Sequence, residues 1–325
     1  MKKAVKQWVM TLIVGPSLLF CAHVSAAEEI ILKPVQVSEH VYYFGGESAM
    51  ASADNKGFMS NAGFVLTDDG VVVFDSLGTP ALGEAMLKAI HEISDQPVKR
   101  VIVSHYHADH IYGLQAFKAA GAEIWAHTNG QAYLNSEEAI NRLAQRRADL
   151  APWVDANTHV VAADRWLDFK DGKILKFEMG GMQFQIIDAS GAHSDEDIMM
   201  FVVNDGVLFA GDLYFSGRIP FVGNANSKTW LTALDSMLQV GPKIVIPGHG
   251  PASEQTESDM KLTRDYLTYL RQEMGHAVEE MTPFEEAYAA TDWSRFEKEP
   301  AFDNANRINA FGTYLLMERE SLDAK

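Results

Sequence analysis

Six consecutive residues carry the densest metal-binding chemistry in this sequence. The hexapeptide His105–His110 reads His-X-His-X-Asp-His and follows a β-branched run, Val-Ile-Val, after a single serine. Alternate residues leaving a strand point the same way, so His105 and His107 can share one metal ion, and the turn that follows directs Asp109 and His110 to a second position. Imidazole and carboxylate ligands suit zinc best, although iron and manganese also accept them. The spacing therefore predicts one loop that serves two metal sites.

Further polar residues follow other predicted strands. His193 lies in Gly-Ala-His-Ser, Asp212 in Ala-Gly-Asp, and His249 in Pro-Gly-His-Gly. Asp75 ends an earlier strand, at the place in the first half of the sequence that matches Asp212 in the second. Each of these residues alone is compatible with a structural, hydrogen-bonded role. Together with the hexapeptide they are more typical of one shared site.

The elements that must position these residues form an internal repeat. Each half of the sequence contains a predicted hairpin with a glycine in its turn, then a helix, a strand and a histidine. Such a repeat predicts an α/β protein in which two halves stack with their sheets inside and helices outside, so that the histidine loops meet at one edge. The predicted elements are hairpin Gly63–Asp75, helix Pro80–Ile93 and strand Lys99–Val103 in the first half, and hairpin Met199–Asp212, helix Ser227–Val240 and strand Lys243–Ile246 in the second.

The N-terminus is predicted to be a secretory signal peptide, residues 1–27. It carries three lysines, an apolar run from Trp8 to Cys21 that is too short to span a bilayer stably, and a small-residue cleavage site, Val-Ser-Ala-Ala. A bulky Phe20 before Cys21 argues against lipidation, and cleavage removes the only cysteine. The mature protein is then predicted to be periplasmic, with no disulfide, thiolate ligand or cysteine nucleophile.

The charge balance argues against nucleic acid as a partner. The formal net charge is −17, and removal of the three leader lysines makes it about −20, whereas a nucleic-acid surface needs a basic patch. With 47% hydrophobic residues, the mature chain can bury a large core. We expect a small-molecule partner and no membrane contact after cleavage of the leader.

Four segments outside the repeat have their own predictions. Residues 256–325 read as a C-terminal helical extension with a supporting or dimerisation role, which leaves 28–255 as the catalytic domain. Ile30–Val37 reads as a strand. Glu47–Ser60 reads as a flexible loop near the mouth of a site or as an ordinary surface loop, and 129–150 as helical, either a lid over the cleft or plain packing on the sheet.

The order of these motifs resembles the metallo-β-lactamase superfamily over about Val35–Ser253. The resemblance implies a four-layer αββα sandwich and two bound zinc ions. It gives Asp75 no ligand role, so this residue is predicted to orient a histidine. The implied first zinc ligands are His105, His107 and His193, the second are Asp109, His110 and His249, and Asp212 bridges the two ions.

A dizinc site of this kind implies hydrolysis. Water shared by two zinc ions has its pKa lowered toward about 7, which makes hydroxide available at neutral pH for attack on a carbonyl carbon. Asp109, besides binding metal, is expected to act catalytically by orienting this nucleophile. Arg218 and Lys228 follow Asp212 in sequence and are candidate anchors for a substrate carboxylate, or else solvated surface charges.

The substrate class stays open at this stage. Asp212 stands where the best-known β-lactamases have a cysteine, and in this it resembles glyoxalase II and the lactonases. Export argues instead for antibiotics as substrates, because glutathione thioesters are made in the cytosol. The sequence thus predicts a periplasmic zinc-dependent hydrolase that opens β-lactam rings, hence antibiotic resistance. The alternatives are an exported lactone or thioester hydrolase and a metal-binding accessory protein of a periplasmic oxidation pathway.

Overall fold

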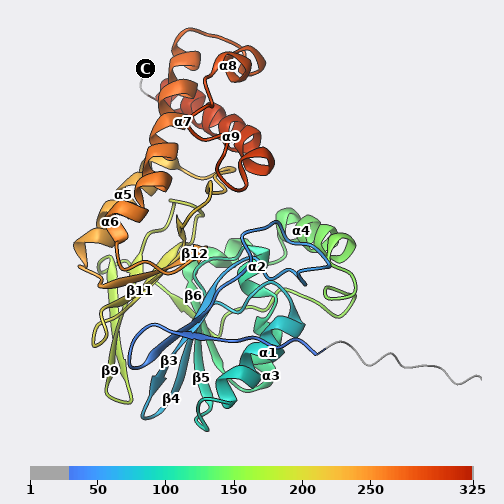
Figure 1. Cartoon of the computed structure of the whole chain (residues 1–325), viewed down its shortest axis with the longest axis vertical. Helices are drawn as coiled ribbons and strands as arrows, with labels where there is room; N and C mark the ends of the chain where they lie inside the picture. Colours follow the sequence, from blue (N-terminus) through green and yellow to red (C-terminus); the bar gives the residue numbers. More distant parts are fainter. Residues whose placement is uncertain (1–28, 324–325) are drawn as a thin grey trace, which may run out of the picture.

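Two β-sheets face each other, with helices on their outer faces (Figure 1). The structure, a computed structural model, describes residues 29–323, so the predicted signal peptide lies outside the described residues. The seven-stranded sheet runs β1 (Val35–Gln36), β2 (Val41–Phe44), β3 (Ala62–Thr67), β4 (Gly70–Phe74), β5 (Val98–Ile102), β6 (Glu123–His127) and β7 (Arg165–Leu167). The five-stranded sheet runs β12 (Ile244–His249), β11 (Val207–Phe215), β10 (Ile198–Val202), β9 (Met182–Asp188) and β8 (Ile174–Met179).

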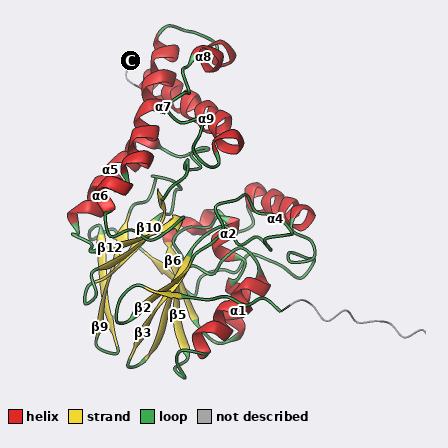
Figure 2. Ribbon diagram, in the orientation of Figure 1, coloured by secondary structure: helices red, strands yellow, loops and turns green. Residues whose placement is uncertain are grey.

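Three hydrophobic layers hold these elements together. One layer lies between the two sheets, where Phe74 of β4 stacks on Phe209 of β11 with ring centroids 5.3 Å apart. A second layer packs helices α1 (Pro80–His91) and α3 (Leu114–Ala119) on the first sheet, and a third packs α5 (Ser227–Gln239) on the second. Three apolar layers separate four layers of secondary structure, so the predicted αββα sandwich is confirmed (Figure 2).

The predicted repeat is also present. Strands β3 and β4 form an antiparallel hairpin, α1 follows, and β5 pairs parallel to β4; strands β10 and β11, helix α5 and β12 repeat this order. Both helices begin at polar caps: the side chain of Thr79 accepts a hydrogen bond from the N–H of Leu82, and Asn226 caps α5 in the same way. Because β5 and β12 run parallel to their neighbours, both carry their histidines at the same edge of the sandwich.

Two predicted elements differ from the structure. The strand expected over Ile30–Val37 is paired only at β1, because Pro34 has no N–H to donate to a neighbouring strand. The region 129–150 is divided into a 3₁₀ turn, η1 (Thr128–Ala132), and helix α4 (Glu137–Asp149). The break occurs where Asn135 takes a positive φ of 61° and Ser136 caps the next helix by accepting from the N–H of Ala139.

The C-terminal residues are helical, as predicted, and extend the second half. Helix α7 packs against both α5 and α9, and its apolar residues share a core with β11 and α5 (Figure 1). None of the helices within residues 29–323 is both long and apolar enough to cross a bilayer. The C-terminal helices are α6 (Thr256–Asp259), α7 (Lys261–Glu279), α8 (Phe284–Ala290) and α9 (Phe302–Asp323).

A buried carboxylate ties the N-terminal strands to the other sheet. Asp205, in the turn between β10 and β11, accepts hydrogen bonds from the hydroxyl of Ser38 at 2.5 Å and from the backbone N–H of His40 at 3.0 Å. Its side chain is 5% exposed, and the His40 imidazole lies 3.1 Å away. Burial alone would raise the pKa of Asp205, but these hydrogen bonds outweigh it and lower the pKa.

We predict that Asp205→Asn lowers the free energy of unfolding by about 1–3 kcal/mol at pH 7, because hydrogen bonds to a charged group are lost. The folded-state pKa lies below the unfolded one, so this contribution is present above about pH 4 and is lost as the pH falls through the folded value. Urea denaturation at pH 7 and pH 3.5 measures the difference. Glu39→Gln, at an exposed neighbouring position, is the control. An equal deficit at both pH values would contradict the assignment.

Candidate metal centre

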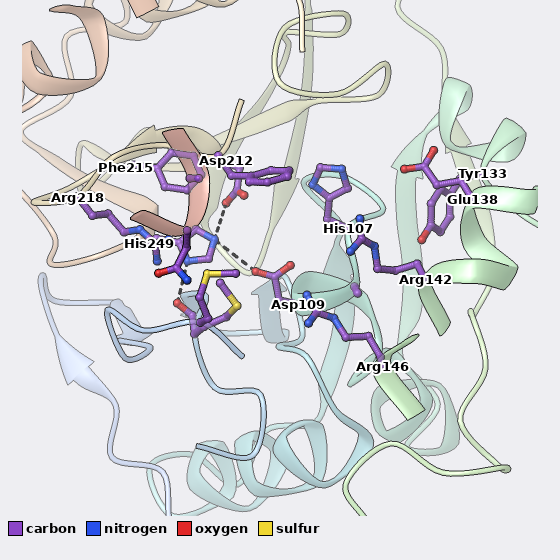
Figure 3. A pocket seen from close by; sticks show the side chains of 16 residues that line it. His107, Asp109, Tyr133, Glu138, Arg142, Arg146, Asp212, Phe215, Arg218 and His249 are labelled. Atoms are coloured by element: carbon purple, nitrogen blue, oxygen red, sulfur yellow. Dashed lines mark hydrogen bonds and ion pairs between the residues drawn. The ribbon is translucent and has the colours of Figure 1, made fainter. Parts of the chain in front are cut away.

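Seven side chains from both halves meet at one edge of the sandwich. Four of them, His107, Asp109, Asp212 and His249, also line a cavity and are labelled in Figure 3. Of the seven, four come from the hexapeptide after β5, where His107 precedes a one-turn helix, α2 (Ala108–Ile111), that carries Asp109 and His110. The other three come from the β9–β10 turn, from β11 and from the end of β12. Together they form two clusters, His105, His107, His193 and Asp212 in one, and Asp109, His110 and His249 in the other.

Donor atoms within each cluster lie within 4.8 Å of one another. In the first cluster, Nε2 of His193 is 3.0 Å from Nδ1 of His107. Two nitrogens bound to one tetrahedral zinc ion at about 2.0–2.1 Å lie roughly 3.3 Å apart, so this spacing suits a shared ion. Imidazole nitrogen and carboxylate oxygen are the donors that zinc accepts in proteins.

The Asp212 carboxylate lies between the two clusters. Its Oδ1 is 3.1 Å from Nε2 of His110 and 3.3 Å from Nε2 of His249, whereas its Oδ2 is 3.5 Å from Nε2 of His193. Oδ1 therefore faces the histidines of the second cluster and Oδ2 faces His193 of the first, as a bridging ligand requires. A Cβ on Gly248 would lie 2.0 Å from Oδ1, so the glycine of Pro-Gly-His-Gly leaves the space in which the carboxylate sits.

Hydrogen bonds on the far side of three rings fix their orientation. Nδ1 of His110 donates to Asp75 at 2.9 Å, and Nδ1 of His249 donates to the carbonyl of Met59 at 2.8 Å. Nδ1 of His105 lies 2.8 Å from the hydroxyl of Ser104. Each ring thus presents Nε2 to the centre, and the predicted orienting role of Asp75 is confirmed.

Several of the inward-facing atoms are buried without a hydrogen-bond partner. They include Nε2 of His105, Nε2 of His110 and Oδ1 of Asp212. Burying unpaired polar atoms is costly, and each such atom calls for an explanation. A pair of divalent cations would satisfy all three, so the residues present fit the dinuclear centre implied by the sequence.

The electrostatics of the cluster favour cations. Burial would raise the pKa of Asp212, but the neighbouring His249 and His110 rings outweigh it and hold the pKa well below its usual range. Burial lowers the pKa of His193 to about 3, whereas the Asp212 and Asp109 carboxylates overcome burial and raise that of His249 to about 9. The carboxylates are therefore ionised, and positive charge is stabilised beside them.

A cavity opens directly onto this centre. Its lining includes Arg218 but not Lys228, which is exposed in the first turn of α5, so only the first predicted substrate anchor faces the site in the described chain. Met50 and Met59 also line the cavity, so of the two alternatives for the 47–60 loop the structure favours the one near the site. The other residues that line the cavity are His107, Ala108, Asp109, Tyr133, Glu138, Arg142, Arg146, Asp212, Phe215, Phe221, His249, Asn304 and Ala305.

The region predicted either as a lid or as packing on the sheet does pack on the core, and it also forms part of the cavity wall. Helix α4 buries Ala139 and packs Leu143 on the first core, while Glu138, Arg142 and Arg146 face the cavity. Sequence reasoning missed these three as site residues. The one available signal was a polar face on a helix that follows the metal loop.

The C-terminal extension contributes to the site. Asn304 and Ala305 of α9 line the cavity, and a buried Asn309 accepts hydrogen bonds from the N–H groups of Val222 and Gly223 at 2.7 and 3.3 Å. It also donates to the carbonyl of Pro220 at 2.8 Å. Gly312 touches the same loop, since a Cβ there would lie 1.7 Å from the carbonyl oxygen of Gly223. Helix α9 thus holds the loop that carries Arg218 and Phe221. No local pattern in the sequence indicates this contact.

Comparison with known proteins agrees with this geometry. Residues 55–249, more than half of the chain, match the model of the metallo-beta-lactamase superfamily. The chain belongs to the metallo-β-lactamase superfamily. Its fold and its two candidate metal sites are those of a metal-dependent hydrolase of this superfamily.

Individual relatives are distant and of two kinds. A linear primary-alkylsulfatase of Pseudomonas sp. (strain ATCC 19151) is 23% identical in an alignment 238 residues long that covers 62% of this chain and 44% of the relative. A type 2 metallo-β-lactamase of Bacillus sp. (strain 170) is 25% identical over 229 residues, 69% of this chain and 76% of the relative. The chain thus spans less than half the length of the alkylsulfatase that it matches.

Solved structures show the same two kinds of neighbour. A metallo-β-lactamase from Pontibacter korlensis superposes with a TM-score of 0.56 at 22% identity, covering 73% of this chain and 99% of that one. A sec-alkylsulfatase from Pseudomonas sp. superposes with a TM-score of 0.68 at 16% identity, covering 88% of this chain and 50% of that one. Because residues 256–325 are 70 of the 325 residues, an 88% match must include part of the C-terminal helices.

We predict that the wild-type protein binds two zinc ions per chain and that His193→Ala binds about one, because the first cluster loses a ligand while the second stays complete. Elemental analysis after dialysis against zinc and buffer gives the stoichiometry. His127→Asn, which replaces a buried histidine outside both clusters, should still bind two. Two tightly held ions in His193→Ala would exclude this residue as a ligand.

We predict that Asn309→Ala raises KM at least several-fold while leaving the zinc content at the wild-type value, because the Arg218 loop loses its support but the metal ligands do not. The variant should also lose about 1–3 kcal/mol of stability from the unpaired backbone groups. Steady-state kinetics, metal analysis and thermal unfolding provide the readouts. Glu318→Gln, at an exposed position on the same helix, is the control, and an unchanged KM in Asn309→Ala would contradict the positioning role.

Proposed function

We propose that this metal-dependent hydrolase is exported to the periplasm and opens β-lactam rings with two zinc ions. The observation that carries the proposal is a buried, unpaired guanidinium, that of Arg218, in the same cavity as the metal-ligand clusters. Every β-lactam antibiotic of the common classes carries a carboxylate near its ring, and a guanidinium is the side chain best suited to bind one.

Arg218 has the surroundings of a ligand-binding group. Arg218 is only 2% exposed. Its Nε and Nη1 atoms have no hydrogen-bond partner among residues 29–323. Burial lowers the pKa of Arg218, although the Asp212 and Asp109 carboxylates oppose this, and an arginine stays protonated in any case. The Cζ atom of Arg218 lies 5.9 Å from the centroid of the Phe215 ring, a cation–π contact that leaves the N–H donors unsatisfied. A buried cation whose donors lack acceptors is destabilising, so an anionic ligand is the occupant that this part of the cavity favours.

The other residues around the centre have different roles in hydrolysis. When bound, the zinc ions would supply Lewis acidity and hydroxide at neutral pH. Asp109, with 14% of its side chain exposed against 5% for Asp212, is the more accessible carboxylate and can accept a hydrogen bond from the nucleophile. Phe215, stacked on His249 with ring centroids 4.9 Å apart, and Phe221 form an apolar wall that limits access of water.

A sulfate ester is a second candidate substrate. It is favoured by the alkylsulfatase relative and by a solved alkylsulfatase fold that extends into the C-terminal helices. Alkyl sulfates also combine an anionic group with an apolar chain, and the cavity pairs arginines with Met50, Met59 and Phe221. The lactone and thioester alternatives are favoured by the ligand pattern, in which Asp212 stands where the best-known β-lactamases have a cysteine. These two alternatives and the accessory role enter as outcomes of the test.

We predict that the zinc-loaded protein hydrolyses a chromogenic cephalosporin, and that Asp109→Asn lowers kcat about 10²–10⁴-fold because the nucleophile loses its orienting group. Absorbance of the opened product measures the rate. Chelation of the metal should abolish it, and added zinc should restore it. If the ring stays closed while an alkyl sulfate, lactone or thioester is cleaved, the β-lactam assignment fails and the hydrolytic centre stands. Negligible turnover of every substrate would instead indicate the accessory role.

We predict that Arg218→Gln raises KM for the cephalosporin about tenfold or more, because a charge-assisted contact worth about 1.5–3 kcal/mol is lost. Zinc content should stay at two ions per chain. Arg319→Gln, an exposed arginine on α9, serves as the control. Lys228→Gln, measured in parallel, decides whether this exposed lysine contributes to substrate binding. An unchanged KM in Arg218→Gln would show that Arg218 does not bind the substrate carboxylate.

A further inference from the structure

The cavity has cationic groups on two sides of the metal-ligand clusters. Arg218 lies on the side of His249 and Asp212, whereas Arg142 and Arg146 lie on the opposite side, with the ligands in between (Figure 3). The two sides come from different halves of the fold, since Arg218 follows β11 and the other two arginines belong to α4. They are therefore separate groups of positive charge within one cavity.

Arg142 and Arg146 form a pair directed at this space. They are one helical turn apart, so their side chains lie on the same face of α4, and both are half-buried. The hydrogen bond from Arg142 to the side chain of Gln145, 3.2 Å long, is the one side-chain hydrogen bond that either guanidinium makes within residues 29–323. Two like charges at this spacing repel each other, and an anion bound between them relieves that repulsion.

Arg147, next to Arg146 on α4, has a structural role. Arg147 donates to the carbonyls of Asp155 and Thr158 at 2.8 and 2.7 Å and does not line the cavity. Glu138 is the one carboxylate that α4 places in the lining, so this wall of the cavity keeps a positive balance. In a chain with a formal net charge of −17, unpaired arginines facing a cavity require a specific reason.

We propose that the cavity binds a dianionic substrate, with one anionic group on Arg218 and a second on Arg142 and Arg146, across the metal centre. The inference rests on the proposed function and specifies its substrate class: a small molecule with an anionic group at each end and an apolar middle. The cavity lining also includes the apolar side chains of Met59, Phe215 and Phe221, which suit an apolar middle. The guanidinium fork binds carboxylate, sulfate and phosphate oxygens alike, so carboxylates serve as the probe.

A matched pair of β-lactams tests the second anionic subsite. Carbenicillin differs from benzylpenicillin by one side-chain carboxylate. For the zinc-loaded full chain we expect the ratio of kcat/KM, carbenicillin over benzylpenicillin, to fall about tenfold or more in the Arg142→Gln/Arg146→Gln double variant, mainly through KM. Arg147→Gln should keep the wild-type ratio. The same ratio in the double variant and the wild type would overturn the proposal.

Binding without turnover separates this inference from the proposed function. Calorimetric titration of the zinc-loaded protein with α,ω-dicarboxylates of about four to eight carbons should find at least one that binds about tenfold more tightly than the monocarboxylate of equal length. The double variant should lose this preference, whereas Arg218→Gln should weaken monocarboxylate and dicarboxylate together. If β-lactams are not cleaved but the preference is found, the substrate assignment fails and the dianion inference stands. If no dicarboxylate is preferred, the inference is wrong whatever the β-lactam result.

Discussion

The carboxylate of Asp212 is the point on which the site depends. One of its oxygens faces His193 and the other faces His110 and His249, so a single side chain joins ligands from both halves of the protein. The contact is possible only because Gly248 has no side chain and because β11 and β12 run parallel, which brings their ends to the same edge. The stacking of the two halves is thus tied to the assembly of the metal centre.

Around this centre several buried polar atoms lack hydrogen-bond partners, which is uncommon in a protein core that binds no metal. Unpaired imidazole and carboxylate atoms point inward, while the opposite ring nitrogens of His110 and His249 are held by Asp75 and Met59. Rigid outer hydrogen bonds fix the ring orientations before any ion arrives, so the ligands need little rearrangement to bind it. A bound ion would offset the cost of leaving these atoms unpaired.

The cavity combines an acidic centre with cationic walls. Carboxylates are confined to positions where they face the ligand clusters, with Glu138 as the exception, and the guanidiniums lie farther out on two separate elements. The metal ions would neutralise the centre, so an incoming molecule would meet a positive surface although the protein as a whole is strongly acidic. The positive charge around the centre follows from this local arrangement and not from the net charge.

The sequence by itself determined the candidate ligand set, the internal repeat and hence the fold class. The hexapeptide, His193, Asp212 and His249 each sit where a short local pattern ends a strand, and such patterns depend on near neighbours in the chain. The side chains that surround the ligands were decided only by the tertiary structure. Whether Arg146 or Arg147 faces the cavity depends on how α4 packs, and Asn304 and Asn309 reach the site through contacts between segments far apart in sequence. Burial of Arg218 likewise results from α9 holding its loop, which no periodicity around residue 218 encodes.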